Sequence, residues 1–291
     1  MPKFKTWLSA FRLRTLPLAT AGIVLGSLLA AAEHALRWRV AALCLVTAVV
    51  LQILSNLAND YGDSVHGADS ENRVGPRRAT QAGHISVAAM RRAVLVFAGL
   101  GLAAGYVLIR DESLVFHAAG LAAIAAAVTY TLGPRPYGYA GLGDIFVLVF
   151  FGVVAVFGTY YLHTHNLNYH VLWPACSCGL FSVAVLNINN IRDRRSDKIA
   201  GKITIPVRIG ERKARLYHWT LLITGAGCAV VFVLLEFRTY WQFLFFLSLP
   251  LILKNGLFVA RTQAAQLDPC LKQMAIATLV FAFSFGLGGL F

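Results

Sequence analysis

Two short stretches of the chain combine carboxylates and amides at helical spacing, and the first lies near residue 60. It carries Asn59, Asp63 and Asp69, with Asp60 and Tyr61 between the first two. Asn59 and Asp63 are four residues apart, so they share one face of a helix. A glycine before Asp69 permits a turn that would bring this third carboxylate back toward that face. The first stretch is therefore a candidate acidic site.

The second stretch repeats this pattern near residue 190. Asn189, Asp193 and Asp197 follow one another at intervals of four residues, so a helix would align all three. The spacing Asn-x-x-x-Asp thus occurs in both stretches. We expect a single domain, residues 1–291, built from two related helical halves that cover roughly residues 1–140 and 141–291.

Aligned carboxylates repel one another, and an ionisable group at mid-membrane costs roughly 2.5–3.5 kcal/mol. A bound divalent cation would offset that repulsion, because Mg²⁺ prefers oxygen ligands and binds through one or two carboxylates together with substrate phosphates. Basic residues suited to phosphate follow both stretches: Arg73, Arg77, Arg78, Arg192 and Lys202. The pattern indicates a site for a magnesium-bound diphosphate. The alternative is a pair of solvated loops whose charges are balanced by neighbouring arginines.

The elements that carry these stretches are predicted to be membrane helices. The chain of 291 residues is 58% hydrophobic and only 13% charged, outside the usual range of soluble domains. Apolar runs of roughly 20 residues recur, each long enough to cross ~30 Å of hydrocarbon. The runs are continuous rather than alternating, which favours helices over a barrel. We place nine spans near residues 16–35, 39–59, 92–110, 113–132, 144–163, 170–190, 216–235, 240–259 and 273–291.

The positive charge of the chain follows from this topology. A formal net charge of +13 would by itself suggest nucleic-acid binding. With the N-terminus in the cytoplasm, however, the cytoplasmic segments hold all Lys and Arg residues except Arg37, Arg39, Arg110 and Arg238. This distribution obeys the positive-inside rule and puts both acidic stretches on the cytoplasmic side. We expect an integral protein of a bacterial inner membrane without a nucleic-acid partner; a cleaved signal peptide at residues 1–32 is the alternative for the N-terminus.

The chain resembles the UbiA superfamily of intramembrane aromatic prenyltransferases. The matching motifs are N-D-Y-x-D-x-x-x-G-x-D from Asn59 to Asp69 and N-N-x-R-D-x-x-x-D-x-x-x-G-K-x-T from Asn189 to Thr204. Residues 73–78, 133–144 and 207–210 are similar to the branch of the superfamily that prenylates 1,4-dihydroxy-2-naphthoate. One departure is Asp144, where many relatives carry Glu, and it leaves an acid in place.

This resemblance implies an all-α fold of about nine transmembrane helices around a central cavity that opens to the cytoplasmic interface. It implies Mg²⁺ as cofactor, with the metal-diphosphate positions at Asn59, Asp63, Asp69, Asp193 and Asp197. The implied reaction transfers a polyprenyl group from a polyprenyl diphosphate to 1,4-dihydroxy-2-naphthoate. The acceptor loses its carboxylate as CO₂, and the product is a demethylmenaquinone.

Further residues are candidates for roles around that reaction. The diphosphate-binding candidates are Asn59, Arg73, Arg77, Arg78, Asn189, Arg192 and Lys202. Asp60 and Asp144 are candidates for acceptor binding or proton handling, and Tyr61 for lining the site; solvated helix caps and an interfacial aromatic belt are the alternatives. One rival function is prenylation of 4-hydroxybenzoate, homogentisate or haem. A transporter is a second rival, but its charges are expected near mid-span rather than at one interface.

Overall fold

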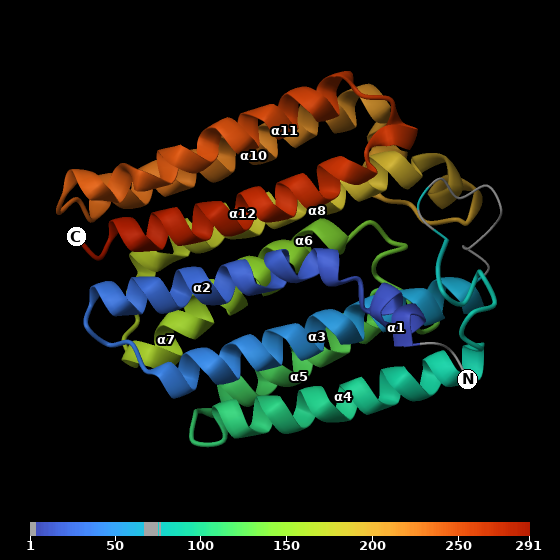
Figure 1. The fold of residues 1–291 in the computed structure, drawn as a ribbon, viewed down its shortest axis with the longest axis horizontal. Coiled ribbons are helices and arrows are strands. Elements are labelled where there is room, and N and C mark those ends of the chain that lie inside the picture. Colours follow the sequence, from blue (N-terminus) through green and yellow to red (C-terminus); the bar gives the residue numbers. More distant parts are fainter. Residues whose placement is uncertain (1–3, 67–74, 76) are drawn as a thin grey trace.

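The computed structural model describes residues 4–66, 75 and 77–291, and these form helices joined by loops (Figure 1). The described residues contain no strand, so the all-α prediction is confirmed. The first half holds α1 (Phe4–Phe11), η1 (Leu13–Thr15), α2 (Leu16–Ala32), α3 (Trp38–Val65), α4 (Val87–Ile109) and α5 (Leu114–Thr129). The second holds α6 (Gly143–Val147), η2 (Leu148–Gly158), α7 (Thr159–Thr164), η3 (Tyr169–Val171), α8 (Leu172–Ile199), α9 (Ile205–Ile209), α10 (Glu211–Leu235), η4 (Tyr240–Ser248), α11 (Leu249–Arg261), η5 (Ala264–Gln266) and α12 (Asp268–Gly288).

Eight helical stretches in the described chain are long and apolar enough to cross a membrane. The apolar helix α5, with 16 residues, is shorter and makes a ninth, so the prediction of about nine spans is confirmed. Helices α3 and α8 each have 28 residues. At 1.5 Å per residue each is about 42 Å long, which exceeds the ~30 Å hydrocarbon layer. Asn59 and Asp63 lie near the C-terminal end of α3, and Asn189, Asp193 and Asp197 lie near the C-terminal end of α8, in the parts of these helices that the hydrocarbon layer does not require.

The span made of α6, η2 and α7 departs from a regular α-helix, because η2 is an 11-residue π-helical segment. It packs very closely against α8. A methyl group added at Gly152 would lie 2.6 Å from the carbonyl oxygen of Ala175 and 3.0 Å from the Cα of Gly179. Only glycine permits this approach. π-helical turns are rare and are frequent at functional sites, and this one forms part of a cavity wall.

Buried apolar side chains form two main core clusters, each contributed by a different group of helices. The larger core comes from α2, η2, α7, α8, α10, η4, α11 and α12. The smaller comes from α1, α3 and α4, with α5 packed against it. Because α2 packs with the C-terminal helices, the cores do not divide the chain at residue 140. The predicted relation between two sequence halves stays a prediction.

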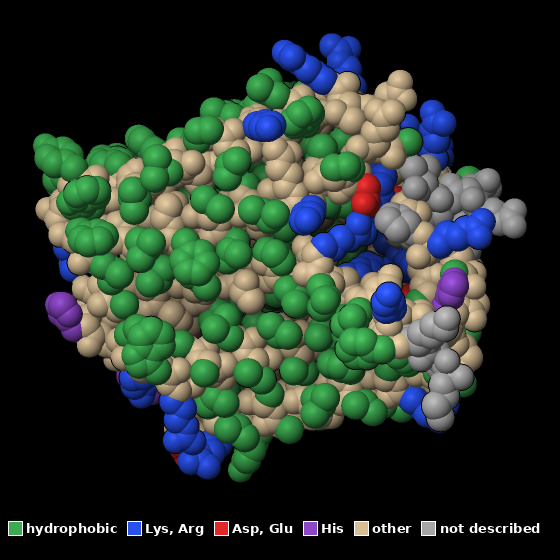
Figure 2. Space-filling view, in the orientation of Figure 1, with side chains coloured by type: hydrophobic (Ala, Val, Ile, Leu, Met, Phe, Trp, Pro, Cys, Tyr) green, Lys and Arg blue, Asp and Glu red, His purple; other side chains and the backbone are tan. Residues whose placement is uncertain are grey.

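The visible face of the molecule is covered with hydrophobic side chains over most of its length (Figure 2). Large exposed apolar residues include Leu95, Leu121, Ile223 and Leu234. Lys and Arg side chains gather around a hollow at the right-hand end of this view, and an acidic side chain is visible there. An apolar belt of this extent is the surface of a protein that lies in a bilayer.

Candidate active site

A cavity of about 610 Å³ extends from the apolar interior to the charged ends of α3 and α8. Asn59 and Asp63 of α3 line its charged end, together with Arg78. Asn189 of α8 and Lys202, from the loop that follows α8, line the same end. The structure therefore brings Asn59 and Asp63 of the first stretch to the same cavity as Asn189 of the second, although the two stretches are far apart in the sequence.

The carboxylate of Asp63 faces this cavity, and the residue is only 3% exposed. Its Oδ2 is 2.5 Å from Nη1 of Arg78, and its Oδ1 accepts a hydrogen bond of 2.9 Å from the hydroxyl of Tyr139. Arg78 also donates to the carbonyl oxygen of Asn59 at 2.5 Å. Partners from two loops thus fix this carboxylate at the cavity wall.

Lys202 links the first stretch to the second. Its Nζ lies 5.5 Å from the ring centroid of Tyr130 and 5.8 Å from that of Tyr139. Burial lowers the pKa of Lys202, but Tyr130, Asp63 and Asp197 together raise it by more, so its pKa lies above the ordinary value. Lys202 therefore stays protonated at neutral pH, with a carboxylate of each stretch nearby.

The carboxylates fit a divalent cation that also takes ligands from a substrate. Asp197 is 9% exposed, and its Oδ2 has no hydrogen-bond partner within the described part of the chain. A buried carboxylate oxygen left unpaired is costly, and a cation would satisfy it. No group of three His, Cys, Asp or Glu side chains among the described residues is placed to hold a metal ion. Mg²⁺ at this position would combine Asp63 and Asp197 with diphosphate oxygens; the predicted ligand Asp69 lies outside the described residues, as does Arg73.

Arg192 has a different surrounding from the one expected for a diphosphate ligand. Its Nε and Nη2 donate to the two carboxylate oxygens of Asp193 at 2.9 and 2.8 Å. Nη2 also donates to Oδ1 of Asn189 at 2.7 Å, and Nη1 to Oδ1 of Asp268 at 2.5 Å. The residue is 3% exposed, and a methyl group at Gly75 would lie 2.8 Å from Nη2. Arg192 therefore holds the second stretch in place through protein contacts.

Asp268, at the start of α12, is a partner that the sequence analysis did not single out. Its two carboxylate oxygens bind Arg192 and Nη1 of Arg14, the latter at 2.7 Å. It thereby joins the N-terminal segment, α8 and the last long helix at the charged end. The available signal in the sequence was an isolated acid beside the final apolar run, which does not reveal its partners.

The three residues predicted to be catalytic lie beside the cavity rather than in its lining. Asp60 accepts hydrogen bonds from the backbone N–H of Ala79 at 3.2 Å and from the hydroxyl of Thr80. Tyr61 packs against the core of α1, α3 and α4. Asp144 is buried and accepts a hydrogen bond of 2.9 Å from the hydroxyl of Tyr217. Their catalytic roles stay predictions.

A smaller pocket of about 300 Å³ adjoins the charged end of the large cavity. The two share Arg12, Arg14, Arg78 and Asn189 in their linings. The smaller pocket is also lined by Asp60, Arg77 and Arg192. Arginine-rich walls of this kind attract anionic substrates and products.

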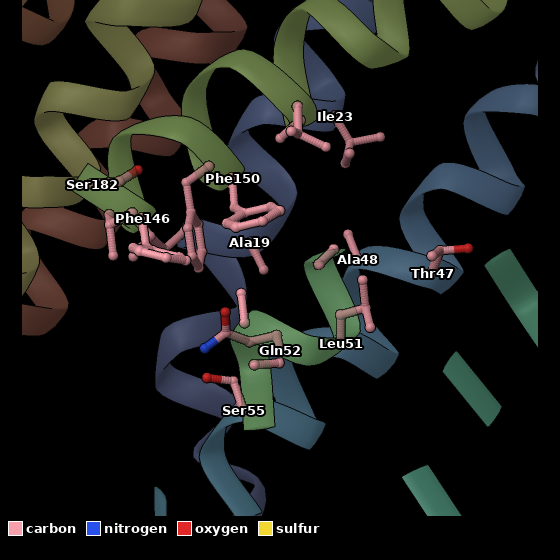
Figure 3. A pocket seen from close by; sticks show the side chains of 18 of the residues that line it. Ala19, Ile23, Thr47, Ala48, Leu51, Gln52, Ser55, Phe146, Phe150 and Ser182 are labelled. Atoms are coloured by element: carbon pink, nitrogen blue, oxygen red, sulfur yellow. The ribbon is translucent and has the colours of Figure 1, made fainter. Parts of the chain in front are cut away.

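The rest of the large cavity is mostly apolar. Ala19 and Ile23 of α2, Leu51 of α3, and Phe146 and Phe150 of the π-helical span point into it (Figure 3). Phe146 stacks on Tyr137 with ring centroids 3.9 Å apart. The cavity thus combines a strongly polar end with a long apolar chamber, which suits a ligand that has a charged head and a hydrocarbon tail.

Comparisons with known proteins agree with this geometry. Residues 19–287 match the UbiA prenyltransferase family. An Escherichia coli protein named 1,4-dihydroxy-2-naphthoate octaprenyltransferase is 44% identical over 98% of this chain and 94% of its own length. A Haemophilus influenzae protein of the same name is 43% identical over 98% of this chain and 96% of its own length.

Solved structures share the fold. The structure of a UbiA homolog from Archaeoglobus fulgidus bound to GPP and Mg²⁺ superimposes with a TM-score of 0.69 at 17% identity, covering 98% of this chain and 99% of that one. A UbiA homolog from Aeropyrum pernix K1, in its apo form, gives a TM-score of 0.67 at 16% identity over 94% and 95% of the two chains. The family match over most of the sequence, the full-length relatives and the common fold lead to one assignment: this chain belongs to the UbiA prenyltransferase family.

Proposed function

We propose that this protein transfers a polyprenyl group from a polyprenyl diphosphate to 1,4-dihydroxy-2-naphthoate. The products would be diphosphate, CO₂ and a demethylmenaquinone in its reduced form. The observation that carries the proposal is the cavity itself, because its charged end holds groups from both acidic stretches and its remainder is apolar. The names of the relatives at 43% and 44% identity support the choice of acceptor.

The charged end supplies the groups needed to bind a diphosphate. Asn59, Asp63 and Asp197 would hold Mg²⁺, with Asp193 fixed beside them by Arg192. Mg²⁺, when bound, neutralises the diphosphate and stabilises it as a leaving group. Lys202 adds a permanent positive charge at the same place, since its pKa is raised.

The apolar chamber protects the carbon that reacts. When the allylic C–O bond breaks, its electron pair leaves with the diphosphate, and the electron-rich ring of the acceptor forms the new C–C bond. The bond from the ring to the carboxylate then breaks, CO₂ leaves, and the electron pair of that bond restores the aromatic ring. Water would compete for the allylic cation, so an apolar lining that excludes water favours prenyl transfer. Binding both substrates in one cavity supplies the proximity that the C–C bond requires.

The membrane setting follows from the substrates. The polyprenyl chain is insoluble in water, whereas the diphosphate and the naphthoate are anions delivered from an aqueous phase. We propose that the charged end faces the cytoplasm of a bacterium and that the protein lies in its inner membrane, as the positive-inside distribution favours.

The test is prenylation in membranes that contain the overexpressed protein. Labelled polyprenyl diphosphate is incubated with 1,4-dihydroxy-2-naphthoate, 4-hydroxybenzoate, homogentisate or haem, with EDTA and then with excess Mg²⁺. Of the four acceptors, we expect only the naphthoate to give a lipid product. EDTA should abolish its formation, and excess Mg²⁺ should restore it. Product formed only with another acceptor would refute the acceptor assignment. Full turnover by Asp63→Ala and Asp193→Ala proteins, shown to be inserted, would refute the site.

A further inference from the structure

The apolar chamber contains a short polar stripe on α3 that the diphosphate site does not use. Gln52 and Ser55 lie on the chamber wall, and the side chain of Gln52 faces the rings of Phe146 and Phe150 across the cavity (Figure 3). Gln52 is 9% exposed. Its Nε2 donates to Oγ1 of Thr15 at 3.1 Å. Within the described part of the chain, the hydrogen bond of the Gln52 side chain uses Nε2, which leaves Oε1 on the cavity wall available to a ligand.

A prenyl chain is a poor match for this stripe. Hydrocarbon offers no hydrogen-bond donor, so covering a buried amide oxygen with it costs about 1–3 kcal/mol. A ligand with hydroxyl groups would satisfy the oxygen instead. Pockets for small molecules commonly combine apolar walls with a few such polar groups, which fix the orientation of the ligand.

The aromatic residues opposite the stripe favour a planar ligand. Phe146 is held by its stack on Tyr137, and the ring centroids of Phe146 and Phe150 are 6.2 Å apart. Aromatic rings prefer offset or edge-on contacts with other rings at such distances. Gln52 lies seven residues before Asn59 on the same face of α3, about 10 Å along the helix axis. A bicyclic ligand at Gln52 would therefore lie next to a diphosphate bound at Asn59.

We propose that Gln52 and Ser55 bind the hydroxyl groups of the aromatic acceptor and so determine acceptor specificity. Gln52 Oε1 accepts a hydrogen bond from one ring hydroxyl, Ser55 pairs with another oxygen of the ring system, and Phe146 and Phe150 contact the ring. This inference rests on the proposed function, which supplies a dihydroxylated bicyclic acceptor.

The first test compares KM values of Gln52→Leu with those of the unmodified protein. Loss of one hydrogen bond of about 1.4 kcal/mol raises KM for 1,4-dihydroxy-2-naphthoate about tenfold. KM for the prenyl diphosphate stays within about twofold, because the chain makes no polar contact there. Gln266→Leu is the matched control, since it makes the same substitution at an exposed position of η5, outside the linings of both pockets. We expect it to leave both KM values unchanged.

The second test identifies the hydroxyl on the ligand. 1-Hydroxy-2-naphthoate and 4-hydroxy-2-naphthoate each lack one hydroxyl and serve as competitive inhibitors. In the unmodified protein, each analogue should bind more weakly than the dihydroxy compound. In Gln52→Leu, one of the two analogues should bind as tightly as the dihydroxy compound. If both analogues lose the same affinity in Gln52→Leu as in the unmodified protein, the assignment of Gln52 is wrong. Ser55→Ala repeats the measurement in case Gln52→Leu fails to insert.

The outcomes separate this inference from the proposed function. If the unmodified protein prenylates the naphthoate but Gln52→Leu and Ser55→Ala keep its KM, the inference alone is wrong. A raised KM for the prenyl diphosphate with an unchanged KM for the acceptor also contradicts it. If the unmodified protein does not prenylate the naphthoate, the proposed function falls, and the inference falls with it.

Discussion

In the first acidic stretch Asp63 faces the large cavity, whereas in the second stretch Asp193 is bound by its own neighbour, Arg192. The partners of Asp63 are Arg78 and Tyr139, which come from loops outside the helix. Arg192 in turn is bound by Asp268 of the last long helix. The two stretches share the spacing Asn-x-x-x-Asp but use it in different ways.

The two stretches therefore have different roles: the first exposes a carboxylate to the cavity, and the second is held in place by contacts within the protein. The first stretch presents a carboxylate to the cavity, and its loop partners fix the position of that carboxylate. The second stretch is braced by a buried network of four hydrogen bonds from one guanidinium. Bracing of this kind fixes groups that contact a metal or substrate and is sensitive to small changes in geometry. The comparison predicts a graded series of mutant effects.

The largest effect is expected at Asp63. Asp63→Asn keeps the shape of the side chain but removes the negative charge that faces the cavity. We expect kcat to fall by about 10²–10³-fold, the usual cost of losing one group that stabilises the transition state electrostatically. The measurement is the initial rate at saturating substrates and Mg²⁺. A loss smaller than that of Arg192→Lys would reverse the comparison.

Arg192→Lys tests the hydrogen-bond network of the Arg192 guanidinium and should cause the second-largest loss of activity. Lysine keeps the positive charge but cannot form the paired hydrogen bonds to Asp193 and Asn189. Residues that orient metal-binding groups typically contribute about 10–100-fold to activity or metal affinity, so we expect a loss of that size. The Mg²⁺ concentration that gives half-maximal rate should rise. An unchanged Mg²⁺ requirement would mean that Arg192 does not position the metal-binding groups.

Asp268→Asn should have a smaller effect, because Arg192 keeps its contacts to Asp193 and Asn189. Loss of one charge-assisted hydrogen bond is worth about 1.5–3 kcal/mol in stability. We expect about a threefold to tenfold lower rate, equivalent to about 0.7–1.4 kcal/mol, because only part of the lost stabilisation affects the position of Asp193 and Asn189. The double variant Asp268→Asn, Arg192→Lys should be less impaired than the two effects multiplied, since both act on one network. Fully multiplicative effects would contradict that link.

The smallest effect on turnover is expected at Asp60. Its carboxylate binds the backbone of Ala79 and the hydroxyl of Thr80, outside the cavity lining. Asp60→Asn should destabilise the protein by about 1–3 kcal/mol through the weakened loop contact while kcat stays within about twofold. Thermal unfolding in detergent and the initial rate are measured on the same preparation. A kcat loss as large as that of Asp63→Asn would instead support the predicted catalytic role of Asp60.

Local patterns in the sequence predicted the features that depend on one helix. The i, i+4 spacing placed Asn59 and Asp63 on one face of α3, and apolar run lengths predicted the spans. Partners across the fold were not predictable in this way. Asp268 meets Arg192 only because α12 packs on α8, and neither helix records that contact in its own periodicity.

The interior polar residues were missed for a related reason. Gln52 lies within an apolar run that reads as an ordinary span, and a single amide does not disturb its hydropathy. Only the three-dimensional placement of α3 and the π-helical span on either side of one cavity reveals that the Gln52 side chain lines it. Asp60 shows the reverse case, since it lies inside a motif and yet binds a loop.

The central claim is that Asp63 and Asp197, one from each stretch, bind the same metal-diphosphate. The most direct measurement is anomalous diffraction from crystals grown with Mn²⁺ and an unreactive prenyl thiodiphosphate. We expect an anomalous peak within coordination distance of a carboxylate oxygen of both residues, with the diphosphate completing the coordination. A peak bound by only one of the two carboxylates, with the diphosphate elsewhere in the cavity, would contradict it.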